Sequence, residues 1–402
     1  MLQIYDYLMH FYHKSKDYFG FIILLGILIV PFLSSFEVYA LMTNNLSTLS
    51  KTLTPLWIKA LKDIILVAIS LLGFLYHLKH KVVINNFYVA LFALFLTVIL
   101  ISLFLSIHNP VLVTLSGLRW ALPLLIPFFI FPLVDDKLIH SIKNPILFLF
   151  FLNFSFQIFQ KFLKYGFYGH NIFGFSDRSP GLFLIPSTSA ALMVLALLFC
   201  LFFIDLSKPQ KVFLKIISFL SVLFSGSFFG ILSLIAMIAT DFRNKFFYKF
   251  ILIFSISFLS IIYFIYVSDR SYESMVYSIN TRFIIFISNL QDAGFFSNKF
   301  GFGTNTAYLI SSGSPTDSNF SCIIVNLGIV GFVIFIGMIF FNLLLAYLRD
   351  NRRVFALTFF ILLASFSLSY TETYPVNLIT ILIVSFLMNL SNTSAVKASK
   401  LI

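Results

Sequence analysis

Long apolar stretches separated by short polar breaks dominate this chain of 402 residues. A helix that crosses a bilayer needs about 20 predominantly apolar residues, and stretches of that length recur along the sequence. They predict an all-α polytopic membrane protein with a single integral membrane domain over residues 1–402. The ten unambiguous stretches lie near residues 19–42, 55–76, 86–107, 112–134, 144–163, 182–204, 247–268, 320–346, 354–370 and 374–391.

A further apolar stretch, residues 212–240, is interrupted by the small residues of LFSGSFFG at 223–230. Lys208, Lys211 and Lys215 lie before or at the start of this stretch, and Arg243, Lys245 and Lys249 follow it. Short basic loops stay on the cytoplasmic side, so both ends of the stretch should lie on that side. The chain therefore crosses an even number of times here, which predicts two helices and twelve crossings in total.

The two helices predicted over residues 212–240 are short. Arms of about 14 residues rise about 21 Å at helical pitch, less than the roughly 30 Å of a hydrocarbon core. The Ser-Gly-Ser turn should thus lie below the outer surface, where free backbone groups are tolerated only against protein or a water-filled cavity. Ser225 and Ser227 are predicted to line the floor of an outward-facing site.

The distribution of basic residues sets the predicted orientation. With both termini cytoplasmic, 17 of the 27 Lys and Arg fall in inside segments, 7 in outside segments and 3 within spans. The longest hydrophilic stretch, residues 269–319, is then an extracytoplasmic loop before the last three helices. Within this loop, residues 271–290 predict a partly amphipathic helix at the membrane interface.

Composition supports the membrane assignment and argues against a soluble domain, a nucleic-acid-binding protein and a metalloprotein. Hydrophobic residues make up 60% of the chain and charged residues only 10%, which leaves too little polar surface to cover a soluble domain. The formal charge of +12 is scattered between apolar stretches, so it indicates topology rather than a nucleic-acid partner. HExxH, CxxC and P-loop motifs are absent and the seven His do not cluster, so neither a metal nor a cofactor is predicted.

Charged residues inside spans are candidates for function because each costs roughly 2.5–3.5 kcal/mol at the bilayer centre. The second span carries Lys59, Lys62 and Asp63. Asp63 and Lys59 have the i,i+4 spacing of a pair on one helix face, and a self-neutralising pair is favoured slightly over a ligand site. Arg119, about seven residues into its span, either reaches outward to the surface or holds an anion such as phosphate.

Arginines on the predicted outer face form a second group of candidates. Arg178 precedes Pro180 and Gly181, which set a turn just before an apolar helix. It either touches lipid phosphates or stands at the edge of a cavity, near a helix N-terminus that favours anions. Arg270 and Arg282 on the long loop raise the same question. Their number on a face otherwise poor in basic residues favours an anion-handling site.

The outer face also carries a carboxylate between aromatic residues. Glu372 lies between two spans and is flanked by Tyr370 and Tyr374. Tyrosines with a carboxylate are typical of sugar sites, and burial among aromatic rings raises a carboxyl pKa. A solvated acid in a turn is the ordinary alternative, with about equal weight.

These features together resemble the O-antigen polymerase and ligase superfamily. About twelve spans, a long external loop before the last three helices, and an Arg-x-x-Gly-x-Phe element at Arg178, Gly181 and Phe183 carry the resemblance. Pro186 follows that element, as the superfamily pattern would have it. The similarity covers most of the chain in topology, through short and degenerate motifs.

Three local matches add to the resemblance. LFSGSFFG is similar to the superfamily's small, Ser-rich break, although Phe228 stands where Arg is usual. TRFIIF places Arg282 at the start of the external block. FGFGTNT, followed by a helix entry that ends in Gly328 and Gly331, is similar to the superfamily's Gly-x-Gly turn and the helix after it.

The resemblance implies a glycosyltransferase-C-like fold in the bacterial cytoplasmic membrane. Its outward-facing cavity would take an undecaprenyl-diphosphate-linked glycan as donor and acceptor, with arginines on the diphosphate. A chain-length regulator and a flippase are further candidate partners. Ligases of this superfamily usually carry His next to Asn on the external loop, whereas this chain reads Asp317, Ser318 and Asn319, and residues 269–319 contain no His. That difference favours an O-antigen or capsule polymerase over a ligase.

The expected roles follow from this interpretation. Arg178 and Arg282 would stabilise charge that develops on the leaving diphosphate, and Asp317 or Glu372 would orient or deprotonate the acceptor hydroxyl. A ligase, or a flippase of lipid-linked oligosaccharides, is the alternative. The predicted substrate-binding residues are Arg119, Arg270, Gly181, Ser225, Ser227, Asn319, Tyr370 and Tyr374.

Overall fold

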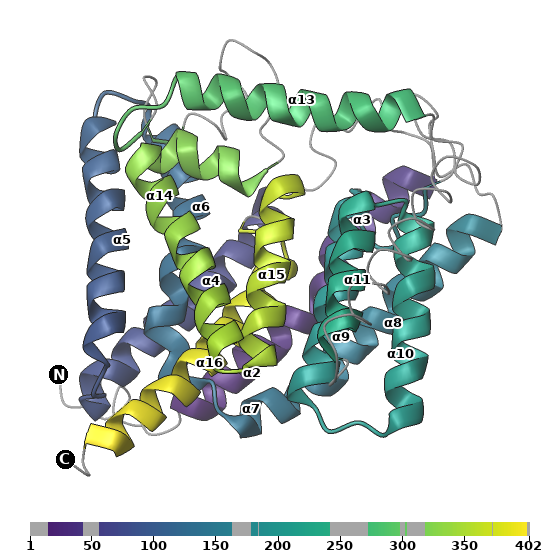
Figure 1. Cartoon of the computed structure of the whole chain (residues 1–402), viewed down its shortest axis with the longest axis horizontal. Coiled ribbons are helices and arrows are strands. Elements are labelled where there is room, and N and C mark those ends of the chain that lie inside the picture. Colours follow the sequence, from purple (N-terminus) through teal and green to yellow (C-terminus); the bar gives the residue numbers. More distant parts are fainter. Residues whose placement is uncertain are drawn as a thin grey trace.

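A computed structural model describes residues 15–42, 56–162, 178–183, 185–241, 272–297, 302–303, 318–371 and 373–399. In these ranges the regular elements are helices, as the apolar pattern predicts, and Figure 1 shows them side by side in a bundle. They are α2 (Ser15–Leu28), α3 (Val30–Met42), α4 (Leu56–His80), α5 (Asn86–Leu105), α6 (Val111–Ile130), the 3-10 turn η2 (Phe131–Leu133), α7 (Asp136–Ser141), α8 (Lys143–Phe162), α9 (Pro186–Phe203), α10 (Lys208–Ser225), α11 (Phe228–Asp241), α13 (Tyr272–Gln291), α14 (Asn319–Leu348), α15 (Arg352–Ser367) and α16 (Val376–Ser399).

Eight helical segments in the described ranges are long and apolar enough to cross a membrane, so the prediction of a multi-pass membrane protein is confirmed. They are Lys16–Phe36, Ala60–His80, Asn86–Leu105, Val111–Leu133, Asp136–Phe162, Pro186–Phe203, Asn319–Leu348 and Val376–Thr393. Each matches one predicted stretch. Of the other predicted spans, α11 and α15 form shorter helices of 14 and 16 residues, α10 begins with three lysines, and residues 247–268 lie outside the described ranges. Twelve crossings stay a prediction.

Helix α9 forms the centre of the bundle. It begins with Pro186, which fits the first helical turn because its missing N–H would lack a partner there anyway. All but two of its 18 residues are buried. It lies between α8, α10, α11, α15 and α16. Helix α11 comes especially close, since a Cβ added to Gly230 would lie 2.6 Å from the Ala190 Cβ.

Helices α10 and α11 form the hairpin predicted from residues 212–240. Gly226 ends α10 in the left-handed conformation, with φ +58°, and α11 begins two residues later. The far end of α11 then returns to the second turn of α10, where Lys215 Nζ lies 2.5 Å from Asp241 Oδ2. Both ends of the stretch therefore lie at the same end of the bundle, as the flanking charges predict.

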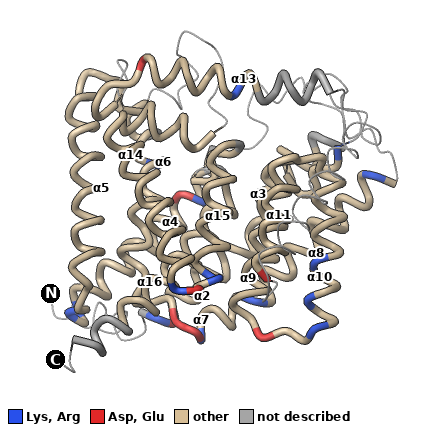
Figure 2. Tube along the Cα trace, viewed as in Figure 1, with Lys and Arg blue, Asp and Glu red and all other residues tan. Residues whose placement is uncertain are grey.

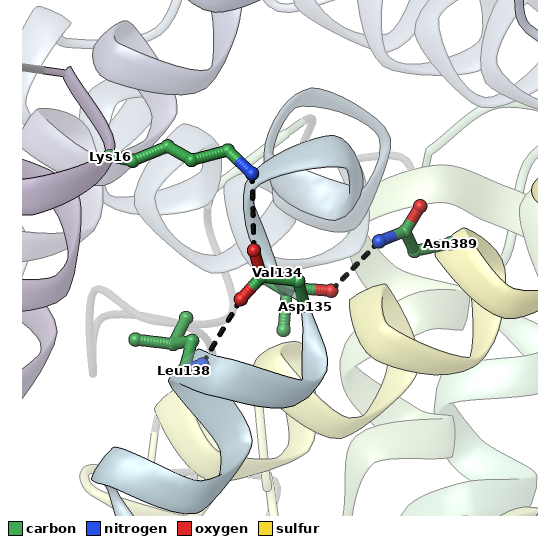
Figure 3. Close-up of polar contacts among 5 residues, drawn as sticks. All are labelled: Lys16, Val134, Asp135, Leu138 and Asn389. Atoms are coloured by element: carbon green, nitrogen blue, oxygen red, sulfur yellow. Dashed lines mark hydrogen bonds and ion pairs between the residues drawn. The ribbon is translucent and has the colours of Figure 1, made fainter.

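Within the described ranges, one end of the bundle carries most of the charged loops, and we call it the basic end. It comprises α7, the start of α10 and the α14–α15 junction, and Figure 2 shows Lys and Arg gathered around α7 and along α10. Here Lys16 Nζ on α2 lies 3.1 Å from Asp135 Oδ2, and Asp135 Oδ1 caps α7 by accepting from Leu138 N. Asn389 on α16 donates to the adjacent Val134 carbonyl (Figure 3). The first and last described helices are thus joined to α7.

Helix α13 lies crosswise over the opposite end of the bundle (Figure 1). The amphipathic helix predicted at residues 271–290 is therefore present, one residue displaced. Its exposed large apolar residues are spaced along one face: Phe283, Ile284, Ile287 and Leu290. Such a face suits the interface between headgroups and acyl chains. We call this end of the molecule the α13 end.

The segment that follows α13 is built into α14. Gly328 interrupts α14 with φ +66° and ψ −167°. Across this break Ile329 N and Val330 N donate to the carbonyls of Gly294 and Phe295, both at 3.0 Å. A Cβ at position 328 would overlap the Phe295 carbonyl, so glycine is required. The break thereby fastens the exit of α13 to α14.

Phe302 and Gly303 from the predicted Gly-x-Gly turn lie inside the bundle. Phe302 is fully buried and donates its backbone N–H to Ser106 Oγ on α5. Gly303 donates to Asn326 Oδ1 at 2.8 Å. A Cβ at Gly117 on α6 would come within 2.6 Å of Gly303. This part of the long loop is therefore packed between α5, α6 and α14.

Candidate functional site

The turn that carries Arg178 lies at the end of the α10–α11 hairpin opposite the basic end. Ser179 N donates to the Phe224 carbonyl at 2.8 Å, which fixes the turn to the last residues of α10. Arg178 Nη2 donates to the Gly226 carbonyl at 2.8 Å. The Cγ and Nε of Arg178 lie 3.1 and 3.2 Å from where a Gly226 Cβ would be. The Arg178 side chain therefore packs directly against the Ser-Gly-Ser break.

Three amide side chains on α8 hold this turn from the other side. Asn153, Gln157 and Gln160 follow one helix face at i, i+4 and i+7, and all three are buried. Their contacts reach three elements. Gln157 Nε2 donates to the Ser179 carbonyl at 3.1 Å and to Ser189 Oγ at 3.0 Å, and its Oε1 accepts from Ser221 Oγ.

Gly181 is clamped on both backbone groups by Gln160. The Gly181 N–H donates to Gln160 Oε1, and Gln160 Nε2 donates to the Gly181 carbonyl, each at 2.7 Å. Leu182 N adds a bond to Asn153 Oδ1 at 3.0 Å. Gly181 has φ +70°, and a Cβ there would overlap the Asn153 amide. The predicted substrate residue Gly181 therefore shapes the turn.

Sequence reasoning missed the three amides on α8. A signal for them was present, because NFSFQIFQ places one amide per helical turn in an otherwise apolar span. Amides within membrane helices are retained where they bond to other parts of the protein. Nothing in that local pattern names the partners, which come from the Arg178 turn, α9 and α10.

The serines predicted to line the site floor are buried at the hairpin break. Ser225 Oγ donates to the Val222 carbonyl at 2.8 Å, within the last turn of α10. Ser227 Oγ accepts from Gly230 N at 3.2 Å and so caps the start of α11. Both hydroxyls therefore stabilise helix ends next to Arg178. Contact between either serine and a substrate stays a prediction.

Arg119 forms an ion pair between α6 and α4. Its Nε lies 2.9 Å from Asp63 Oδ1, with the two side chains 39% and 33% exposed. The sequence favoured Lys59 as the partner of Asp63. That interpretation considered only one helix, whereas the structure supplies a cation from the neighbouring helix. Arg119 therefore already has a carboxylate partner.

A polar cluster joins the start of α14 to the link between α15 and α16. Thr371 Oγ1 donates to Asn319 Oδ1 at 2.8 Å, and Asn377 Nδ2 donates to the Thr371 carbonyl at 3.0 Å. Asn319 is fully buried, and its Nδ2 has no hydrogen-bond partner in the described part of the chain. Tyr370 is buried beside this cluster, and the Tyr374 hydroxyl donates to the Gly26 carbonyl.

The remaining predicted residues divide into two groups. Arg282 lies in the middle of α13 and is partly buried. Asp317, Glu372 and Arg270 lie outside the described residues, so both candidate bases are unplaced. Within the described ranges, no group of three or more His, Cys, Asp or Glu is arranged to hold a metal ion.

Comparison of the chain with models of protein families and with curated proteins finds no match.

Proposed function

We propose that this protein is a polysaccharide polymerase that joins undecaprenyl-diphosphate-linked repeat units at the α13 end. In this proposal the chain crosses the bacterial cytoplasmic membrane twelve times, with both termini and the basic end in the cytoplasm. The product is an O-antigen or capsule glycan. A flippase that supplies the repeats and a chain-length regulator are the expected partners.

The observation that carries the proposal is the support built around Arg178. Buried amides are costly in a membrane protein unless they are bonded, and Asn153, Gln157 and Gln160 each form at least one hydrogen bond to this short turn. The bond from Arg178 Nη2 to the Gly226 carbonyl fixes the direction of the guanidinium at this turn. A cation fixed in this way at the end away from the basic loops suits the phosphates of an outer-leaflet lipid.

The chemistry required of the site is modest. An acceptor sugar hydroxyl attacks the anomeric carbon of the growing chain, the bond from that carbon to the diphosphate oxygen breaks, and the diphosphate leaves with the electron pair. Arg178 and Arg282 stabilise the charge that develops on it. Asp317 or Glu372 takes the hydroxyl proton. Arg119 is the weaker candidate for diphosphate contact because Asp63 already neutralises it.

The test uses purified protein in vesicles supplied with lipid-linked repeats on the outer surface. Wild-type protein should convert the repeats to a ladder of longer glycans. Arg178→Ala should lower the rate by about 100-fold, the usual cost of removing one fixed donor from a developing negative charge. Lys161→Ala, which removes a cation near the end of α8, is the matched control and should keep the ladder.

Two results would contradict the polymerase proposal. If wild-type protein moves the lipid across the bilayer and makes no ladder, the protein is a transporter. If transfer occurs only when a chemically different acceptor lipid is added, and the product gains one chain and no ladder, the protein is a ligase. If Arg178→Ala retained full activity, Arg178 would not be part of the diphosphate site.

A further inference from the structure

A cavity of about 1540 Å³ opens at the basic end, away from the Arg178 turn. Its walls come from α5, α6, α14, α15 and α16, and the ends of α9, α10 and α11 contribute to its mouth. Tyr370 is the predicted site residue found in its lining. Arg178 and Arg282, the arginines assigned to the proposed polymerase reaction, are not among its described lining residues.

Three arginines stand at the mouth of the cavity within five positions of the α14–α15 junction. Arg349, Arg352 and Arg353 all line it. Asp350 lies among them, but its side chain is 88% exposed and its carboxylate is 3.9 Å from Arg352 Nη2, so the pairing contributes little. The junction therefore presents a net positive charge to the cavity.

Arg353 is oriented by an aromatic ring. Its Cζ lies 5.7 Å from the centroid of Phe203, at the end of α9. Such a contact stabilises the cation and does not consume the guanidinium N–H groups, which are the donors that match phosphate oxygens. Across the mouth, Asp241 is held by Lys215 at 2.5 Å. The lining also carries Asp136 and Asp205, so the positive charge is concentrated at the α14–α15 junction and not around the whole mouth.

Behind the arginines the cavity walls are mainly apolar. Phe95, Phe128, Phe335, Ile361 and Ile381 belong to five different helices that surround the space. The lining runs along α15 from Arg352 to Ile361 and resumes at Tyr370 and Thr371, beyond the end of the helix. The 16 residues of the helix rise about 24 Å. That length is most of the roughly 30 Å hydrocarbon core. The cavity therefore has the shape and polarity of a lipid: a charged head at the mouth and an apolar chain along the helices.

We propose that this cavity binds an anionic phospholipid from the leaflet at the basic end. Its phosphate lies at Arg349, Arg352 and Arg353, and an acyl chain runs along the wall formed by α5, α14 and α15. The proposal goes beyond glycan transfer, and it does not depend on the polymerase assignment.

The experiment measures lipid retention by native mass spectrometry. The full chain is purified in detergent and exchanged into an equal mixture of phosphatidylglycerol and phosphatidylcholine with matched acyl chains. Wild-type protein should retain phosphatidylglycerol about tenfold over phosphatidylcholine, since basic residues near a membrane surface favour anionic lipid. The Arg349→Gln/Arg352→Gln/Arg353→Gln variant should retain the two lipids nearly equally.

Two further variants separate the cavity from the rest of the surface. Lys79→Gln/Lys81→Gln removes two cations from the same end that do not line the cavity, and its preference should match wild type. Met338→Trp enlarges a side chain of the wall and should lower retention of both lipids by several-fold while leaving their ratio unchanged.

Three outcomes would overturn the proposal. Equal retention of both lipids by wild-type protein would remove the charge argument. An unchanged preference in the triple arginine variant would place the lipid elsewhere. Displacement of phosphatidylglycerol by millimolar inorganic phosphate, with no effect of Met338→Trp, would show that the mouth binds free phosphate and that the apolar wall plays no part.

Discussion

At the scale of single residues, Gly181 and Gly337 form a matched pair. Gly181 has φ +70° and has no room for a Cβ, whereas a Cβ on Gly337 in α14 meets no atom within 4 Å. Gly181→Ala should therefore destabilise the protein by about 1–3 kcal/mol from backbone strain alone. Gly337→Ala should be neutral or stabilise by up to about 1 kcal/mol. Thermal unfolding in detergent measures both, and equal effects would show that the Arg178 turn is not rigid.

The ion pair between Arg119 and Asp63 predicts a non-additive result. Arg119→Leu leaves a carboxylate without its partner in a membrane span, and we expect a loss of about 2–3 kcal/mol. Arg119→Leu/Asp63→Leu removes both charges and should recover most of that stability. A double-mutant cycle tests this: the thermal unfolding midpoints of wild type, Arg119→Leu, Asp63→Leu and the double variant are compared.

Activity in the same cycle separates structure from chemistry. If the double variant recovers stability and still builds the glycan ladder, Arg119 serves the fold. If the stable double variant has lost the ladder, the arginine contacts substrate and its bond to Asp63 is exchanged during the reaction.

At the scale of elements, the α10–α11 hairpin predicts that two positions far apart in sequence share one side of the membrane. Cysteines placed at Ser207 and Asp241, in a variant with Cys200 and Cys322 replaced by Ala, should both react with an impermeant thiol reagent from the basic end. A cysteine at Lys161 should react from the other side. Opposite sides for positions 207 and 241 would exclude the hairpin.

The sequence predicted this hairpin because two local signals agree. Basic residues flank the apolar stretch, and the small residues of the Ser-Gly-Ser break interrupt it. In the structure Gly226 ends α10 there in the left-handed conformation. The amphipathic helix α13 was likewise readable from its own periodicity. The contacts of Gln160 and Asp63 could not be predicted from the sequence. A polar side chain in a span bonds to whichever helix the fold brings alongside, and a local pattern does not specify that neighbour.

At the scale of the whole molecule, the contacts around Asp135 predict a small pH dependence of stability. Partial burial raises the pKa of the Asp135 carboxyl, but the hydrogen bond from Leu138 N–H and the nearby Lys16 ammonium outweigh it and lower the pKa below its ordinary value. A carboxyl with a lowered folded-state pKa stabilises the protein above its unfolded pKa. That contribution is lost as pH falls through the folded-state value.

The expected size is below about 1 kcal/mol, because the Lys16 and Asp135 side chains are 50% and 39% exposed. The unfolding midpoint of wild type should fall between pH 6 and pH 3, and Asp135→Asn should make that fall slightly smaller. Asp136→Asn, one residue further along, is the control and should leave the difference as in wild type. A larger effect from Asp136 would show that the cap on α7 is misassigned.

The overall path of the chain was largely predictable, since apolar length and loop charge are properties of sequence alone. The cavity at the basic end was not predictable, because it depends on how α5, α14 and α16 are arranged around one another. Most lining residues of α14 and α16 are apolar and do not differ in type from the rest of those spans.

The backbone break at Gly328 has a mechanical consequence. Because Ile329 and Val330 bond to the segment that leaves α13, a helix on one membrane surface is fastened to the middle of a span. Further along that span, Phe335 lines the cavity that opens on the opposite surface. We therefore expect a tilt of α13 to shift α14 and, through it, the wall of the cavity at the basic end.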